Sequence, residues 1–181
     1  LIIFAGILLV SVNLIGKSFF TPEGSEMVYS WKEALRYGSF QAVSAQTSTG
    51  FTTANYDLWP FPPQLFMLLL MYFGGMSGST AGGLKTSRFF MLFKNSIYKI
   101  ESIFKPEKIK KFKIGNTSIS PEVINTVLIF FFVAVCFAVI GTIIFVLDGI
   151  DPETAFGTVT CMMNNIGISF RAAGPTESFA F

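Results

Sequence analysis

The chain has 181 residues, of which 51% are hydrophobic and 13% are charged, and its formal net charge is +2. Soluble domains carry roughly 25% charged residues, so this composition indicates a membrane protein and excludes an ordinary soluble domain. The sequence contains no histidine, which excludes a histidine-dependent catalytic triad. Its two cysteines, Cys136 and Cys161, lie in apolar segments without metal-ligand spacing. We therefore expect no enzyme and no bound cofactor.

Two apolar segments are the clearest membrane spans in the sequence. Residues 1–16 carry no charge, no basic region and no cleavage site, so they predict a membrane helix and not a signal peptide. Residues 123–147 form an uncharged run that, at about 1.5 Å per residue, exceeds the ~30 Å hydrocarbon core. The sequence begins without methionine and stops where "TESFAF" opens a new apolar stretch. We therefore expect the chain to be a piece of a longer multi-pass protein.

The basic residues predict the orientation of these spans. Nine of the 13 Lys and Arg lie between Lys85 and Lys113, and "KPEKIKKFKIG" at 105–115 holds five Lys against one Glu. By the positive-inside rule, residues 101–120 are a cytoplasmic linker, and residues 17–61 and 148–171 are external. Membrane lipid is the expected partner of the lysines. Since no aromatic platform accompanies them, we expect no nucleic-acid binding.

The two external segments repeat one plan, in which a short amphipathic stretch is followed by a glycine-containing polar stretch and a return into the membrane. The amphipathic stretches, residues 31–46 and 152–163, are too short to span a bilayer and predict re-entrant pore helices. In the second stretch, Asp151 suits the N-cap and Pro152 the first helical position. The predicted fold is an all-α membrane protein built from helix, re-entrant pore loop and helix repeats.

Each predicted pore helix runs into a polar bend, centred on Gly50 or on Gly167. Irregular backbone at this depth is tolerated only where it is buried in protein or lines water, and carbonyls without amide partners can replace the hydration shell of a cation. Glycine provides backbone conformations closed to other residues, and Phe51 is expected to anchor the first bend in surrounding protein. The candidate ion-filter residues are Thr47, Ser48, Thr49, Gly50, Phe51, Asn164, Asn165, Ile166, Gly167 and Ile168.

The segment "MYFGGMSGSTAGGLKTSR" at 71–88 also breaks the rules of a membrane helix, because five glycines fall within ten positions after only nine apolar residues. Interior glycine costs roughly 1 kcal/mol relative to alanine, so the helix is expected to break near mid-membrane. A small-residue packing interface and a phosphate-binding loop are the alternatives, and a flexible gate is favoured. The candidate gate residues are Gly74, Gly75, Gly78, Ser79, Thr80, Gly82, Gly83 and Lys85. Lys85 is expected to anchor the helix end at the membrane interface or to hold the loop by hydrogen bonds.

Three stretches, "SAQTSTGFTT", "LFMLLLMYFGGMSGSTAGGLKTSRFFMLFK" and "NNIGIS" with the later "GPTESF", resemble the Trk/Ktr/HKT superfamily of potassium transporters. The resemblance implies four helix, pore-loop and helix repeats around one pore. Residues 1–100 would then be the third repeat, with a broken helix at 62–99, and residues 121–181 most of the fourth, with its last helix starting at 172–181. It further implies K⁺ at the backbone of Thr49, Gly50, Ile166 and Gly167, with Na⁺ a possible second ion.

The resemblance also implies potassium uptake across the bacterial cytoplasmic (inner) membrane, a homodimer of the full-length subunit, and a cytosolic nucleotide-binding regulatory ring of the TrkA/KtrA kind. One departure from the family pattern is Arg171, which would repel K⁺ at the outer mouth unless an acid such as Glu177 pairs with it. The alternative function is a non-conducting membrane subunit whose glycine stretch packs helices. That alternative predicts a continuous helix from Gly74 to Gly83.

Overall fold

The computed structural model describes residues 2–20, 26–76, 78–104, 113–114 and 117–177. Over these residues the α-helices are α1 Ile2–Leu14, α2 Trp31–Thr47, α3 Phe61–Tyr72, α4 Thr86–Phe104, α5 Pro121–Leu147 and α6 Pro152–Met163. Two 3₁₀ helices span Tyr56–Leu58 and Arg171–Ala173. The short strands are β1 Ser18–Phe20 with β2 Glu26–Val28, β3 Phe73–Gly74 with β4 Leu84–Lys85, and β5 Lys113–Ile114 with β6 Thr117–Ser118.

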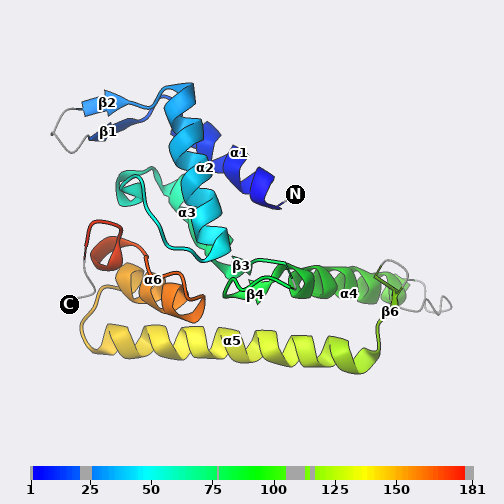
Figure 1. Ribbon diagram of the computed structural model, residues 1–181. Coiled ribbons are helices and arrows are strands. Elements are labelled where there is room, and N and C mark those ends of the chain that lie inside the picture. The colour runs from blue at the N-terminus through cyan, green and yellow to red at the C-terminus, as the bar shows by residue number, and fades with distance from the viewer. Residues whose placement is uncertain (1, 21–25, 77, 105–112, 115–116, 178–181) are drawn as a thin grey trace.

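Helices α1, α2 and α3 form one packed group, shown in blue to green in Figure 1. Small residues bring their axes close together. A Cβ added to Gly38 of α2 would lie 3.1 Å from the Cα of Ser11 on α1, and one added to Gly6 would lie 2.9 Å from the Leu70 side chain on α3. Close approach through small residues is the usual basis of helix packing in membranes.

Helices α5 and α6 form the second group, and α6 lies along the C-terminal part of α5 (Figure 1). Helix α5 is the described helix that is long and apolar enough to cross a membrane, with a mean hydropathy of 3.0 in its most apolar window. Its Gly141 faces Val159 of α6, where an added Cβ would lie 3.2 Å from the valine side chain. In both groups an apolar helix is followed by a second helix that packs against it and then by a loop.

The helix through the glycine-rich segment is interrupted. Helix α3 ends at Tyr72 and α4 begins at Thr86, and β3 and β4 pair in parallel between them, with Phe73 opposite Leu84. Five glycines in this stretch remove the side-chain packing and raise the entropy cost that a continuous helix would carry. The packing-interface alternative predicted a continuous helix from Gly74 to Gly83, and this prediction is wrong.

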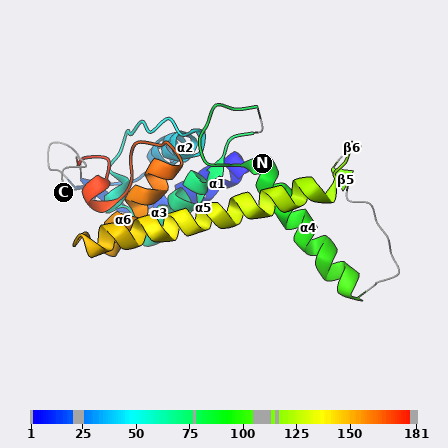
Figure 2. The ribbon, with the colours of Figure 1, turned by 90° about the horizontal axis from the view of Figure 1, so that it is seen from below.

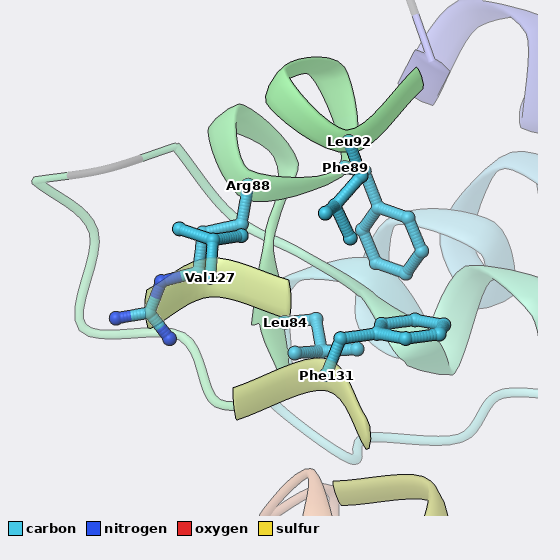
Figure 3. A pocket seen from close by; sticks show the side chains of 6 residues that line it. All are labelled: Leu84, Arg88, Phe89, Leu92, Val127 and Phe131. Carbon is cyan, nitrogen blue, oxygen red and sulfur yellow. The ribbon is translucent and has the colours of Figure 1, made fainter. Parts of the chain in front are cut away.

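The start of α4 packs against α5 through apolar side chains, and the rest of α4 diverges from α5 (Figure 2). Figure 3 shows this contact, with the rings of Phe89 and Phe131 turned toward each other at a centroid distance of 6.1 Å. Arg88 points away from the apolar contact in Figure 3, and its guanidinium lies 4.4 Å from the ring of Phe130. Half of the predicted linker 101–120, namely residues 105–112 and 115–116, lies outside the described residues.

The helix expected from residue 172 onward does not form over the residues that the structure describes. A 3₁₀ helix, Arg171–Ala173, is followed by turns as far as Glu177. Gly174 and Pro175 explain the difference, because proline disfavours the α conformation of the residue before it and glycine weakens a helix. Residues 178–181 lie outside the described part of the chain.

The two short helices have well-formed N-terminal caps. In α2, the hydroxyl of Ser30 accepts from the Glu33 N–H at 3.4 Å, and the Glu33 carboxylate accepts from the Ser30 N–H at 3.0 Å, which is a capping box. In α6, the Asp151 carboxylate accepts from the Thr154 N–H at 2.8 Å, so the predicted N-cap is confirmed. These hydrogen bonds hold the pKa of Glu33 and of Asp151 below the ordinary range.

Replacing Asp151 with alanine should destabilise α6 by about 1 kcal/mol at neutral pH, because an N–H at the helix start loses its acceptor. Since the folded state lowers the pKa of Asp151, its stabilisation is present above the pKa of the unfolded chain, about 3.9, and disappears as the pH falls below that value. The difference in thermal unfolding midpoint between wild type and Asp151→Ala should therefore shrink in acid.

Asp148→Ala is the matched control, because Asp148 is an exposed aspartate at the C-terminal end of α5. A negative charge at that end of a helix is not stabilising, so this variant should not lower the midpoint. Equal losses in both variants, or a loss in Asp151→Ala that does not depend on pH, would contradict the capping role.

Candidate functional site

The two predicted filter stretches lie side by side. A Cβ added to Gly50 would collide with the carbonyl oxygen of Ile166 and lie 3.1 Å from its carbonyl carbon. Between the two loops is an open hollow of about 490 Å³. It is lined by Ser48, Thr49, Cys161, Met162, Asn165, Ile166 and Gly167. Backbone from the end of α2 and from the end of α6 thus faces one common space.

Both loops contain two residues with left-handed φ, spaced two positions apart. The first residue after α2, Ser48, has a φ of 56°, and Gly50 has a φ of 71°. After α6, Asn165 has a φ of 53° and Gly167 a φ of 90°. A left-handed polar residue followed two positions later by a left-handed glycine turns the chain sharply at the C-terminal end of each helix. The sequence repeat is therefore also a repeat of backbone geometry.

The hydroxyl groups of the first loop bind back to the end of α2. Thr47 donates to the Val43 carbonyl at 2.7 Å, and Thr49 donates to the Ser44 carbonyl at 3.3 Å. The hydroxyl of Ser44 donates in turn to the Phe51 carbonyl at 2.7 Å. The Ser44 carbonyl also accepts from the Thr49 N–H at 3.1 Å, so the threonine hydroxyls add bonds to carbonyls that the backbone already pairs. The hydroxyls of Ser44, Thr47 and Thr49 therefore support the bend, and Ser44 provides the partner of the Phe51 carbonyl.

Several backbone oxygens between the two bends have no protein partner. Within the described part of the chain, the carbonyls of Ser48, Thr49 and Gly50 accept no hydrogen bond, and neither do those of Ile166 and Gly167. Each group follows the C-terminal end of a helix, where the helix dipole adds partial negative charge. Unpaired carbonyls at a negative helix end attract a cation and repel an anion.

The side chains of the predicted filter residues have different environments. Ile166 is buried and Ile168 packs against the same apolar core, whereas Asn165 is exposed. The expectation that Phe51 anchors its bend is wrong, because its side chain is 72% exposed. The Phe51 residue is held instead through its carbonyl, because the serine that binds it lies inside α2.

The glycine-rich loop touches the start of the second filter stretch. A Cβ at Gly82 would collide with the Asn164 carbonyl oxygen, and one at Gly83 would lie 2.6 Å from the Asn164 side-chain oxygen. Asn164 is buried, and its amide donates to the Thr160 carbonyl at 2.7 Å. Glycine at 82 and 83 therefore permits a contact between the loop and the backbone that supports the second bend.

Hydrogen bonds from the start of α4 hold the loop in place. The ammonium group of Lys85 donates to the carbonyls of Ser79, at 2.7 Å, and of Ala81. The Thr86 hydroxyl donates to the Gly74 carbonyl at 2.6 Å. Two roles were expected for Lys85, and these hydrogen bonds correspond to the second, in which Lys85 holds the loop. Two of the predicted gate residues are less constrained, since Gly78 and Thr80 are exposed and a Cβ at Gly78 would meet nothing within 4 Å.

Arg171 at the outer end of the second loop is paired with Glu153, not with Glu177 as the sequence suggested. Its Nε donates to the Glu153 carboxylate at 2.7 Å. Glu153 lies in the first turn of α6, and a left-handed φ of 56° at Arg171 turns the chain back toward that turn. The positive charge is thereby neutralised close to the loop, although exposed ion pairs contribute little to stability.

Sequence analysis missed a group of aromatic residues beside the loops. Tyr56 is completely buried, and its hydroxyl donates to the Ser169 carbonyl at 2.6 Å. Its ring lies 5.2 Å from that of Phe170 and 6.2 Å from that of Trp59. The spacing of Tyr56 and Trp59, three residues apart in "NYDLWP", is a signal for one shared face of a turn. The partners across the fold could not be read from that spacing.

The fold and the paired loops define an all-α membrane protein with helix, pore-loop and helix repeats. The family model described as "TrkH: Cation transport protein" matches residues 1–180, and the chain belongs to this family. The predicted fold class and the predicted superfamily are thereby confirmed. The members of this family are transport proteins, which agrees with the prediction that the chain is not an enzyme.

Individual relatives support the assignment. The chain is 34% identical over 145 residues to the Trk system potassium uptake protein TrkG of Escherichia coli, covering 80% of this chain and 30% of that protein. It is 31% identical over 133 residues to TrkH of Salmonella typhimurium, covering 74% and 28%. The crystal structure of the potassium transporter TrkH from Vibrio parahaemolyticus matches with a TM-score of 0.77 and 26% identity, over 96% of this chain and 34% of that one. The chain thus spans about a third or less of these relatives.

Replacing Gly50 with alanine tests the contact between the two loops. Gly50 has a φ of 71° and Gly16 a φ of 77°, so alanine is strained by about 1–2 kcal/mol at both positions. Only at Gly50 does the new Cβ also meet a carbonyl oxygen, because nothing lies within 4 Å at Gly16. We expect Gly50→Ala to lose about 1–3 kcal/mol more stability than Gly16→Ala. Thermal unfolding of the purified protein measures this difference, and equal losses would count against the loop contact.

Proposed function

We propose that this chain forms half of the lining of a potassium permeation path, completed in the whole protein by two further repeats. The observation that carries the proposal is the pair of loops whose residues line one hollow, with Gly50 against the Ile166 carbonyl and, over the described residues, without hydrogen-bond partners for the carbonyls of Thr49, Ile166 and Gly167. The names of the relatives, which are potassium uptake proteins of Trk systems, supply the identity of the ion. Na⁺ is the second ion that such a path could admit.

The energetic step is the exchange of water for backbone oxygen. A K⁺ ion that enters from outside loses part of its hydration shell and gains the carbonyls of Thr49, Gly50, Ile166 and Gly167. The ends of α2 and α6 point partial negative charge at the same space, which offsets part of the dehydration cost. Glycine at 50 and 167 lets the backbone take the left-handed turn without a side chain in the path.

The glycine-rich loop between β3 and β4 is proposed to close the path below the filter. Two features support this role, namely its contact with Asn164 and its attachment through Lys85. Glycines lower the barrier to rearranging the loop, while the Lys85 and Thr86 hydrogen bonds favour the closed arrangement. Flux would then depend on how often these bonds break.

The whole protein is proposed to be a subunit of a multi-component uptake system in the bacterial cytoplasmic membrane. The relatives are uptake proteins of Trk systems, which supports a function in an assembly. A homodimer of the full-length subunit and a cytosolic nucleotide-binding ring are the partners we propose. Residues 101–120 carry the basic charge expected of the face that meets such a ring.

Gly50→Asp and Gly167→Asp should each abolish potassium uptake by the complete protein in a bacterium that lacks its own uptake systems. A carboxylate in the path binds the ion too tightly or blocks the passage, and the turn is also strained. The amount of protein in the membrane fraction should stay close to wild type. Gly149→Asp is the control, because Gly149 also has a left-handed φ, of 94°, and open space around it, but lies outside both loops. Normal uptake in both filter variants would refute the filter assignment.

Lys85→Met should increase potassium leakage through the complete protein, by about threefold or more, because it removes two charge-assisted hydrogen bonds from the loop. Lys99→Met is the matched control, since Lys99 is an exposed lysine of α4, the helix that directly follows Lys85 of β4. Efflux of a potassium tracer from loaded cells or vesicles measures the effect. The gate proposal fails if leakage is unchanged in Lys85→Met or if the two variants leak alike.

A further inference from the structure

A hydrogen bond from Tyr56 connects the segment after the first pore loop to the segment that follows Gly167 in the second. Tyr56 opens the 3₁₀ helix Tyr56–Leu58, six residues after Gly50, and its hydroxyl donates to the Ser169 carbonyl two residues after Gly167. Both residues are completely buried. The O–H to O distance of 2.6 Å is at the short end for such bonds. A carbonyl that lost this donor would be buried without a partner.

The backbone that carries Tyr56 is itself held from two sides. On α3, the side-chain amide of Gln64 donates to the carbonyls of Tyr56 at 3.3 Å, Asp57 at 2.7 Å and Trp59 at 3.0 Å. On α2, the amide of Gln41 donates to the Ala54 carbonyl at 3.1 Å. The hydroxyl of Tyr56 therefore projects from a fixed segment.

Aromatic packing restricts the ring as well. The Tyr56 ring makes edge-to-face contacts with Phe170, at 5.2 Å, and with Trp59, at 6.2 Å. The indole N–H of Trp59 donates to the hydroxyl of Tyr29 at 3.0 Å, which fixes Trp59 in turn. Burial also raises the pKa of Tyr56 above its ordinary value, so the phenol stays protonated and remains a donor at physiological pH.

The second loop has fewer attachments of its own on this side. The Ser169 N–H donates to the Ala173 carbonyl at 2.8 Å, and the Ala172 N–H donates to the Thr154 hydroxyl at 3.4 Å. Between Gly167 and this short turn, the Tyr56 hydroxyl is the described donor that comes from the other repeat. The hydrogen bond from Tyr56 thus helps to fix the position of the second bend relative to the first.

We propose that Tyr56 is a positioning residue that sets the separation between the carbonyls of the two pore loops and thereby the preference for K⁺ over the smaller Na⁺. The proposal rests on the filter function proposed above. Discrimination requires that the carbonyls do not close around a smaller ion. A bond from the first repeat to the backbone next to Gly167 opposes that closure.

Tyr56→Phe tests the proposal, because it deletes the hydroxyl and keeps the ring that packs on Phe170. Tyr29→Phe is the matched control, since it also deletes a buried phenolic hydroxyl of the same aromatic group, whose partner is the Trp59 indole. In the complete protein, two readouts are measured: hydrogen exchange of the amides in 166–173, and the ratio of K⁺ to Na⁺ flux in competition. In Tyr56→Phe we expect exchange to rise and the flux ratio to fall, each about threefold to tenfold. In Tyr29→Phe both should stay within about twofold of wild type.

The two proposals fail in different ways. If Gly50→Asp and Gly167→Asp abolish uptake but Tyr56→Phe leaves exchange and flux ratio as in wild type, the filter stands and the role of Tyr56 is refuted. If Tyr56→Phe raises exchange without changing the flux ratio, the bond is structural and the positioning role is refuted. If Tyr29→Phe has the same effect as Tyr56→Phe, the aromatic group acts only as a core, and the role assigned to the Tyr56 hydroxyl is again refuted.

Discussion

A backbone carbonyl inside a membrane needs a partner, and the arrangement of the two pore loops follows from that requirement. At the end of α2 and of α6 the chain leaves the helix, and Thr49 and Asn165, which follow these ends, are exposed in this chain. Side chains satisfy part of the exposed backbone, as Ser44 and Thr47 do. Residues of both bends line the hollow beside the Gly50–Ile166 contact, and over the described residues the carbonyls of Thr49, Ile166 and Gly167 accept no hydrogen bond from the protein.

The two repeats satisfy this requirement with different side chains. In the first loop, hydroxyl groups bind back to α2 and leave Phe51 exposed. In the second, apolar packing by Ile166 and the donor supplied by Tyr56 hold the bend. The shared element is the backbone, with left-handed residues at corresponding positions of both loops. Two loops of unequal sequence thus share left-handed positions that different side chains support.

Features with a local cause could be predicted from the sequence. The cap at Asp151 depends on residues within one turn, and the breaks at Gly50, Gly167 and the glycine-rich segment depend on glycine itself. Features that depend on residues far apart in the chain could not. The partner of Arg171 and the contact of Tyr56 with Ser169 require the two repeats to be placed against each other, and the sequence pattern contains no measure of that placement.

The parallel pairing of β3 with β4 has a mechanical consequence for the segment between them. Because Phe73 lies opposite Leu84, the two ends of the glycine-rich segment are adjacent, and the segment forms a closed loop like a flap attached along one edge. Such a flap can swing without lengthening or shortening the path from α3 to α4, so the helices that flank it need not shift. The contacts of the segment are therefore near its paired ends, where Lys85 and Thr86 hold it and Gly82 and Gly83 meet Asn164.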